Sequence, residues 1–248
     1  MSVIEVKHFK KSFAGRTIHE DVTFKVEKGE CVGLVGGSGV GKSVVLRSLI
    51  GLEKPDSGEI WIDGTEISKL SERDLVPIRK KVAYVFQNGA LFDSMSVYSN
   101  LAYPLREHTD LGEEQIKRRI HEQLEEFGLS EAVDKLPAEL SGGMQKRVGL
   151  ARAMMIGPKV ILYDEPTAGL DPYNTLKIRE TVLRLKKKGV TSLFVTHDMP
   201  TAVAVCDRFC LLGGGKVKAE ASVDHIDGSG KRKGDGELEK FINGEDGF

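Results

Sequence analysis

Short apolar runs separated by polar turns follow one another along most of this chain. The runs 4–6, 22–26 and 30–35 are joined by tight turns and predict an antiparallel opening. The turn Asp63-Gly64 follows another run and indicates a hairpin. Later runs predict further strands at 59–62, 82–86, 160–163, 192–195, 209–212 and 216–219. Helix starts are indicated at Ser71, ahead of an apolar stretch at 75–78, and at Asp171, which is followed by proline.

A helical pattern takes over between residues 88 and 158. One amphipathic helix is marked by four apolar residues at helical spacing, with charges between them: Ile116, Ile120, Leu124 and Phe127. A second helix is predicted over 142–156, ending before a Gly-Pro pair. These helices interrupt the series of strands, so the sequence predicts an α/β domain with an inserted α-helical block.

The domain organisation follows from this alternation. A single domain is expected over 1–220, with a core formed by 1–87 and 159–220 and a helical subdomain at 88–158. Residues 221–248 are expected to form a linker and a short helix, because 227–236 consist of Gly, Ser and charged residues, as in flexible linkers. A short final helix is expected from its apolar residues Leu238, Phe241 and Ile242.

The amino-acid composition agrees with this fold class and limits the kinds of binding partner that we expect. The 248 residues are 40% hydrophobic and 29% charged, as in ordinary globular proteins, and the net charge is −1. Such a balance offers no overall attraction to nucleic acid. No apolar run approaches the ~20 residues of a membrane-spanning helix. Three cysteines, Cys31, Cys206 and Cys210, fit neither a disulfide framework nor a zinc site, and we expect buried, reduced thiols in a cytosolic protein.

One glycine-rich stretch between a predicted strand and a predicted helix carries the strongest chemical signal. It matches the pattern G-x-x-x-x-G-K-[ST], in which backbone N–H groups converge on phosphate oxygens at a helix N-terminus. Its residues, with the first of the helix, are Gly36, Gly37, Ser38, Gly39, Val40, Gly41, Lys42, Ser43 and Val44. Lys42 supplies a positive charge to the outer phosphates and Ser43 a hydroxyl ligand for Mg²⁺. The sequence therefore predicts a nucleotide site in a P-loop NTPase core.

Polar residues at the carboxyl ends of three predicted strands are candidates for the same site, because such ends border the ligand crevice of a parallel sheet. Asp164 is positioned to hold Mg²⁺, and Glu165 to deprotonate the attacking water. His197 is positioned to sense the γ-phosphate, although a hydrogen-bonded loop histidine is the alternative. Gln87 points toward the crevice or is a plain turn residue. Phe13 stacks on a base or belongs to the core.

A second anion site is predicted at the stretch Leu140-Ser141-Gly142-Gly143-Met144. Ser141 is a good N-cap. Two glycines in a first helical turn are costly unless something must approach the backbone. With the phosphate loop, Gln87, Asp164-Glu165, Asp171 and His197, this stretch makes the chain resemble the ATP-binding cassette (ABC) ATPases over residues 1 to about 220.

The resemblance implies a fold and a role for each matching position. It implies a mixed, mainly parallel sheet with an antiparallel β subdomain and an inserted helical signature subdomain. Phe13 would stack on adenine, and Gln87 would join the Mg²⁺ and water site. Ser141, Gly142 and Gly143 would bind the γ-phosphate of ATP held by a second copy, with Asp171 at the interface. Working sites would then need a homodimer that holds ATP and Mg²⁺ between its subunits.

The amino-acid sequence of residues 87–109 and the LSGGM stretch resemble those of one branch of the ABC ATPases, the Mla-type ATPases of bacterial phospholipid trafficking. This implies a subunit on the cytoplasmic face of the inner membrane that drives a separate permease. It also implies MCE-domain and small accessory partners, with phospholipid carried by the complex and not by this chain. Ala90, Leu91, Phe92 and Met95 either line a permease groove or pack the subdomain.

Two alternatives remain open at the level of sequence. The same ATPase would serve another cargo, in lipoprotein release or small-solute uptake. A soluble ABC switch acting on ribosomes or DNA is the other alternative, and the near-neutral charge argues against it.

Overall fold

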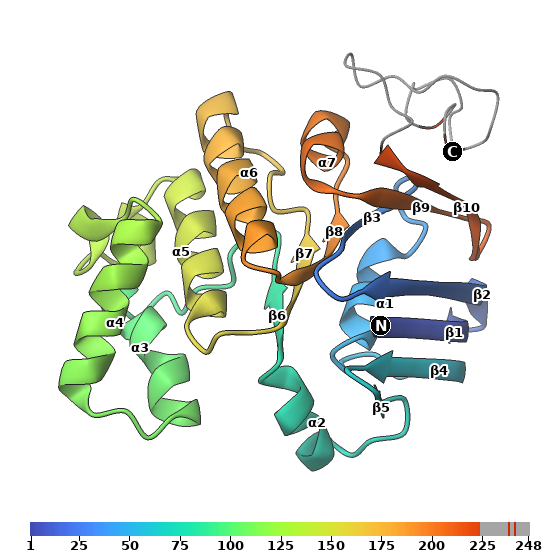
Figure 1. Cartoon of the computed structure of the whole chain (residues 1–248), viewed down its shortest axis with the longest axis horizontal. Coiled ribbons are helices and arrows are strands. Elements are labelled where there is room, and N and C mark those ends of the chain that lie inside the picture. Colours follow the sequence, from blue (N-terminus) through green and yellow to red (C-terminus); the bar gives the residue numbers. More distant parts are fainter. Residues whose placement is uncertain (224–237, 239–240, 242–248) are drawn as a thin grey trace.

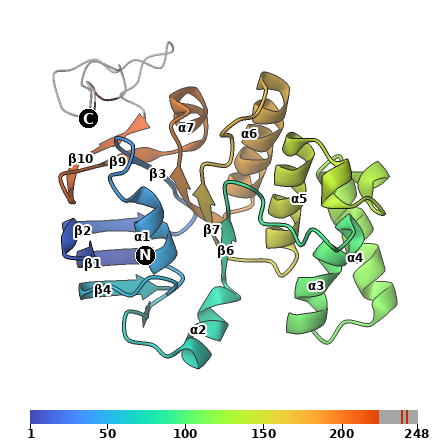
Figure 2. The same cartoon turned by 180° about the vertical axis from the view of Figure 1, so that it is seen from behind.

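The computed structural model describes residues 1–223, 238 and 241. Figure 1 shows three regions side by side: helices α3, α4 and α5 at one end, a central set of strands, and the strands β1, β2 and β4 at the other end. Figure 2 shows the same arrangement from behind, with α1 lying over β1 and β2. Among the described residues, no helix combines the length and the apolar character needed to cross a membrane.

Ten strands form one mixed sheet with the order β5-β4-β1-β2-β10-β9-β3-β8-β7-β6. Strands β9, β3, β8, β7 and β6 pair in parallel, whereas β1, β2, β4 and β5 pair antiparallel. Their bounds are β1 Ser2–Phe13, β2 Arg16–Glu27, β3 Cys31–Val35, β4 Ser57–Ile62, β5 Thr65–Glu66, β6 Val82–Val85, β7 Val160–Asp164, β8 Thr191–Val195, β9 Arg208–Gly213 and β10 Lys216–Ser222. The expected mixed, mainly parallel sheet with an antiparallel part is confirmed.

Helices cover both faces of this sheet. Their bounds are α1 Lys42–Ser48, α2 Glu72–Arg79, α3 Val97–His108, α4 Glu113–Glu126, α5 Gly142–Met154, α6 Pro172–Lys187 and α7 Met199–Val205, with short 3₁₀ turns at Ser130–Ala132 and Pro137–Glu139. Three of them, α3, α4 and α5, follow β6 and precede β7. The predicted helices at 116–127 and 142–156 correspond to α4 and α5.

The prediction of an antiparallel opening is right for the first two strands and wrong for the third. Strands β1 and β2 form a long antiparallel pair. Strand β3, however, lies between β8 and β9 and pairs in parallel with both. Its five residues are all buried, which is typical of a central parallel strand and not of a half-exposed hairpin strand. The short turn before β3 therefore leads from the antiparallel region into the parallel one.

Alternation along the central strands divides the core into two layers. On β3, Cys31 and Val35 face a cluster built with α3 to α7, whereas Val32 and Leu34 face a cluster built with α1 and α2. The three cysteines are buried and free, as predicted. Because the sheet is covered on both faces, its polar chemistry is confined to the strand ends.

Two helices were not predicted, α3 and α7. Both carry a proline, Pro104 inside α3 and Pro200 at the start of α7, and this weakens the helical pattern. Both nevertheless have a capping residue that the sequence shows. The Ser96 side chain accepts a hydrogen bond from the Ser99 N–H, and the Asp198 side chain accepts one from the Thr201 N–H.

The end of the chain is described only in part. Strand β10 runs to Ser222, two residues past the expected domain limit at 220. Leu238 is helical and fully buried, and Phe241 is helical and packs against the same cluster as α3 to α7. Ile242 and most of the predicted linker lie outside the described residues.

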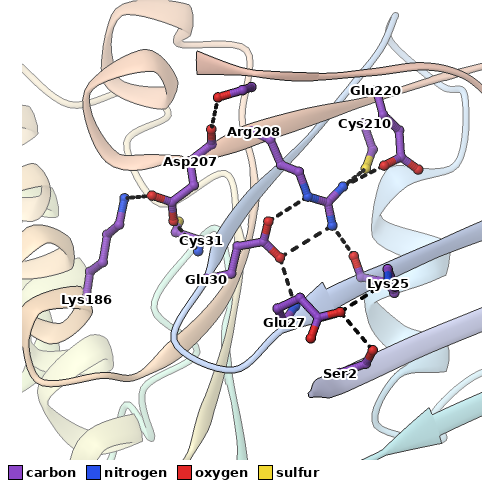
Figure 3. Close-up of polar contacts among 11 residues, drawn as sticks. Ser2, Lys25, Glu27, Glu30, Cys31, Lys186, Asp207, Arg208, Cys210 and Glu220 are labelled. Atoms are coloured by element: carbon purple, nitrogen blue, oxygen red, sulfur yellow. Dashed lines mark hydrogen bonds and ion pairs between the residues drawn. The ribbon is translucent and has the colours of Figure 1, made fainter. Parts of the chain in front are cut away.

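An arginine joins the two parts of the sheet at the end far from the phosphate loop (Figure 3). Arg208 on β9 donates through Nε to Glu30 Oε1 at 2.6 Å and through Nη1 to Glu220 Oε2 at 2.7 Å. It also donates to the carbonyl of Lys25 on β2. Both Arg208 and Glu30 are less than one fifth exposed. The group thus links β2, β9, β10 and the turn that enters β3.

Replacing Arg208 with leucine should lower the free energy of unfolding by about 2–3 kcal/mol, because it leaves the mostly buried Glu30 carboxylate without its partner. Urea denaturation followed by circular dichroism measures this. Arg106 makes a similar pair with Glu113, but both side chains are about half exposed. Arg106→Leu should therefore cost less than about 1 kcal/mol. Equal losses in the two variants would contradict the structural role of Arg208.

Candidate functional site

A cleft of about 780 Å³ opens at the carboxyl ends of β3, β7 and β8. Many of the residues singled out from sequence line it: Ser38, Gly39, Gly41, Lys42, Ser43, Val44, Gln87, Glu165 and His197. Five lining residues with polar side chains were missed: Arg47, Thr167, Thr175, Thr196 and Asp198. The cleft therefore lies where a doubly covered parallel sheet binds its ligand.

The phosphate loop is held in shape by contacts that a larger residue would block. Gly41 precedes α1 with φ of +94°, and a Cβ there would come within 2.4 Å of the His19 ring. Lys42 folds back into the loop, where Nζ donates to the carbonyls of Gly36 at 2.8 Å and Gly37 at 2.9 Å. Burial lowers the pKa of Lys42, and the carboxylates of Glu165 and Asp164 act in the opposite direction. The ammonium is thus held within the loop by two backbone carbonyls.

His19 is a supporting residue that sequence reasoning missed. It lies on β2, fully buried, with Nε2 3.1 Å from the Gly41 carbonyl and its ring 5.4 Å from that of Phe9. Burial lowers its pKa, so the neutral ring is favoured. Neutral Nε2–H donates to Gly41 and ties the antiparallel strands to the phosphate loop. In the sequence, His19 lies before the predicted strand at 22–26, in a mostly polar stretch, so no pattern marked it.

A carboxylate and two hydroxyls meet beside the loop. The Ser43 hydroxyl donates to Asp164 Oδ1 at 2.8 Å, and the Tyr84 hydroxyl donates to Oδ2 at 2.7 Å. Burial raises the pKa of Tyr84, and the bond to Asp164 raises it further, so Tyr84 remains a donor. Ser43 and Asp164 offer hard oxygen atoms next to the phosphate cradle, which is the donor set that Mg²⁺ prefers alongside phosphate and water. These residues therefore fit a magnesium ion.

Glu165 and His197 form the next pair along the strand ends. Glu165 Oε2 accepts the His197 backbone N–H at 3.1 Å, and Oε1 lies 3.3 Å from His197 Nε2. The Glu165 side chain is 14% exposed, whereas that of His197 is 52% exposed. Glu165 has φ of +51°, an uncommon conformation for a residue with a side chain. The carboxylate is therefore fixed at the cleft wall by its neighbour.

The glycine-rich helix start lies apart from this cleft. Ser141 caps α5 by accepting a hydrogen bond from the Met144 N–H at 3.3 Å, and Ser141 and Gly142 are exposed. Gly143 is buried, and a Cβ there would meet the Asn174 side chain at 2.2 Å. The group that approaches this backbone within one chain is thus Asn174, which sequence reasoning missed. Nothing lies within 4 Å of a Cβ at Gly142.

Asp171 and Phe13 are also outside the lining of the cleft. Asp171 caps α6, where it accepts hydrogen bonds from Asn174 N at 2.9 Å and from Asn174 Nδ2 at 2.6 Å. These bonds lower its pKa. Phe13 ends β1, is 39% exposed, and has Lys11 Nζ 5.0 Å from its ring centroid. Its ring is therefore accessible and does not belong to the core.

Two contacts connect α5 with the cleft. Lys146 Nζ donates to the carbonyl of Ala168, which lines the cleft, and burial lowers the pKa of Lys146. On the next turn, a Cβ at Gly149 would lie 2.6 Å from the Gly89 carbonyl. The loop after Gln87 thus packs directly on the backbone of the helix that begins at Ser141.

A smaller groove of about 260 Å³ lies between β6, α3 and α5. Its exposed aromatic residues are Phe92 and Tyr103, whose ring centroids lie 5.2 Å apart. Of the four residues considered for such a groove, only Phe92 lines it. Leu91 packs against the core, and neither Ala90 nor Met95 is part of the lining. The loop is fixed by the buried Asn100, whose side chain binds the backbone of Phe92, Met95 and Ser96.

The ABC transporter family model matches residues 19–168, more than half of the chain. This chain belongs to the ABC transporter family. Its solved relatives agree: a dimeric ATP-binding cassette, MJ0796, bound to ADP and Pi superimposes with a TM-score of 0.83 at 31% identity. The match covers 89% of this chain and 98% of that one. The matched domain is therefore an ABC ATPase cassette, which uses ATP with Mg²⁺.

Curated ABC relatives carry several different names. MlaF of Haemophilus influenzae, an intermembrane phospholipid transport ATP-binding protein, is 37% identical over 91% of this chain and 86% of its own length. MetN of Carboxydothermus hydrogenoformans, for methionine import, is 42% identical over 84% of this chain. The mkl protein of Mycobacterium leprae, a probable ribonucleotide transport protein, is 46% identical over 84%. The chain spans 61% of this MetN and 60% of this mkl.

Proposed function

We propose that this chain is the ATP-hydrolysing subunit of a bacterial ABC transporter that moves phospholipids between membranes. The proposal of phospholipid as the cargo rests on the match to MlaF, which extends over 91% of this chain and 86% of that protein. The mixed sheet and the cleft support the ATPase part of the proposal.

Phosphate binding falls to the loop and to Lys42. The Lys42 ammonium now donates to two loop carbonyls, and it can exchange them for phosphate oxygens without leaving its buried position. Because Lys42 is largely buried, its charge acts more strongly on the phosphates than it would in bulk water. The Ser43 hydroxyl, the Asp164 carboxylate and the Gln87 amide would hold Mg²⁺, which neutralises charge on the transferred phosphoryl group.

Proton transfer falls to Glu165. Its carboxylate lies at the cleft wall, and we assign it as the base that accepts the proton of the attacking water. His197 donates its backbone N–H to Glu165 Oε2, so it fixes the carboxylate and presents its half-exposed ring to the γ-phosphate position. Adenine would stack on the accessible ring of Phe13.

A second copy completes the site in this proposal. Ser141, Gly142 and Gly143 lie outside the cleft lining of their own chain, and Ser141 and Gly142 face solvent at a helix N-terminus that suits anions. Facing another copy's phosphate loop, they would bind the γ-phosphate, with Asp171 near the interface. The working form is then a head-to-tail homodimer that closes on ATP and opens after hydrolysis.

The membrane partner would occupy the groove at Phe92 and Tyr103. The proposal places the chain on the cytoplasmic face of the bacterial inner membrane, bound to permease subunits, with MCE-domain and small accessory subunits in the complex. Phospholipid is carried by those partners. Small-solute import is the second candidate, because MetN is 42% identical to this chain.

Affinity purification of the full chain from its native membranes tests the cargo. We expect a permease, an MCE-domain protein and bound phospholipid to be recovered by mass spectrometry. Phe92→Asp should lose these partners but keep ATP binding, because Phe92 lies outside the nucleotide cleft. A permease recovered with a solute-binding protein would indicate solute import instead. Recovery of RNA or DNA without any permease would indicate a non-transport switch.

A further inference from the structure

Tyr84 on β6 is the one residue that touches both the nucleotide chemistry and the partner groove within the described part of the chain. Its hydroxyl donates to Asp164 Oδ2 at 2.7 Å. The same residue lines the groove that holds Phe92 and Tyr103. Its ring also lies 4.2 Å from that of Phe86, the residue before Gln87. Tyr84 thus belongs to both places: its hydroxyl lies at Asp164, and the residue is part of the groove lining.

The bond to Asp164 gains importance when a cation is bound. In this structure each oxygen of the Asp164 carboxylate accepts one hydroxyl, from Ser43 on one side and Tyr84 on the other. For Ser43 to ligate a cation, a lone pair of its oxygen must face the metal, and its hydrogen must turn away from the metal. The Tyr84 bond, on the opposite carboxylate oxygen, needs no such change. It is then the contact that keeps the Asp164 plane oriented.

We propose that Tyr84 is a positioning residue that orients the Asp164 carboxylate for the divalent cation and makes this orientation sensitive to what occupies the groove. The inference rests on the proposed magnesium role of Asp164. An occupant that shifts Tyr84 in the groove lining also shifts its hydroxyl, because a phenol ring is rigid and its oxygen lies on the ring axis. Groove occupancy is in this way transmitted to the cation site through one side chain.

Equilibrium Mn²⁺ binding tests the positioning role without turnover. The full chain is titrated with Mn²⁺ in the presence of a non-hydrolysable ATP analogue, and free Mn²⁺ is measured by electron paramagnetic resonance. Tyr84→Phe keeps the ring but removes the donor, and we expect Mn²⁺ affinity to fall about tenfold, as for a lost hydrogen bond to a charged group. Analogue binding in EDTA should not change. Unchanged Mn²⁺ affinity would overturn the proposal.

Tyr163→Phe is the matched control. Tyr163 precedes Asp164 on β7, and successive side chains of a strand point to opposite faces. The substitution therefore removes an equal hydroxyl close by but not the bond to Asp164, and Mn²⁺ affinity should stay within twofold. An equal loss in both variants would show a general packing effect and overturn the proposal. A third variant, Asp164→Asn, distinguishes a failure of the Tyr84 proposal from a failure of the magnesium role of Asp164. Wild-type Mn²⁺ affinity in that variant would refute the magnesium role of Asp164 itself.

A bulky label in the groove tests whether groove occupancy affects cation binding through Tyr84. The native cysteines are at most 5% exposed, so Tyr103→Cys can be labelled selectively with a fluorescein maleimide. We expect the label to change Mn²⁺ affinity at least threefold when Tyr84 is present and to have no effect in the Tyr84→Phe background. An equal change in both backgrounds, or no change in either, would overturn the coupling.

Discussion

Glu165→Gln should lower the ATP turnover rate by about 10²–10⁴-fold, the usual contribution of a general base. Glutamine keeps the size of the side chain and still accepts the His197 N–H, but its amide cannot take a proton from water. ATP binding should therefore survive while the bond to the γ-phosphate stays intact. The variant should accumulate as an ATP-bound dimer, detected by size-exclusion chromatography with light scattering after addition of ATP and Mg²⁺.

The matched control for this variant is Glu122→Gln. Glu122 is exposed on α4, far from the cleft lining, and the same loss of one negative charge there should leave turnover unchanged. Parental turnover in Glu165→Gln would refute the assignment of Glu165 as the base. Lost turnover without a stable dimer would instead place the defect in nucleotide binding, and a fluorescent ATP analogue would detect that difference.

Lys42→Ala and Ser141→Arg should each abolish turnover alone, and mixing the two inactive proteins should restore it. The reason lies in the proposed composite site, in which Lys42 of one chain faces Ser141 of the other. A mixed dimer places both substitutions in one site and leaves the second site intact. If subunits exchange freely and sites act independently, an equimolar mixture should recover about a quarter of the parental rate. A steady-state phosphate-release assay measures this.

A second mixture provides the control for complementation. Lys42 and Glu165 line the same cleft of one chain. Mixing Lys42→Ala with Glu165→Gln therefore damages both sites of every mixed dimer, and no activity should return. If this control recovered as much activity as the Lys42→Ala and Ser141→Arg mixture, the head-to-tail arrangement would be refuted. No recovery in either mixture would mean that sites do not act independently or that the signature does not work in trans.

Most helices and strands of the fold could be predicted from the sequence, because the signals that mark them, such as helix caps and turn residues, lie within a few residues of one another. The capping residues Ser71 and Asp171 accept hydrogen bonds from backbone groups three positions later, so a four-residue window already contains each helix start. The hairpin at Asp63-Gly64 is local in the same sense. The error at 30–35 arose because apolar character gives a strand but not its neighbours, and β3 pairs with residues more than 150 positions away.

The supporting residues of the site were missed for a related reason. His19 lies in a mostly polar stretch before the predicted strand at 22–26, and Asn174 is an ordinary polar residue near the start of a helix. Their importance comes from the partners they meet, Gly41 and Gly143, and in each case a glycine leaves the space that the other side chain fills. Such pairs have no fixed spacing along the chain, so no pattern within either segment indicates them.

The sequence by itself predicted a nucleotide site, the glycine-rich stretch that would form its phosphate loop, and the starts of several helices, because these depend on backbone groups close together in the chain. The tertiary structure decided which strands are neighbours and which side chains meet at the proposed cation site. Asp164 meets Ser43 across 121 positions and Tyr84 across 80. Only the packing of a buried parallel sheet brings those strand ends together, and that packing also puts Tyr84 between the cleft and the groove.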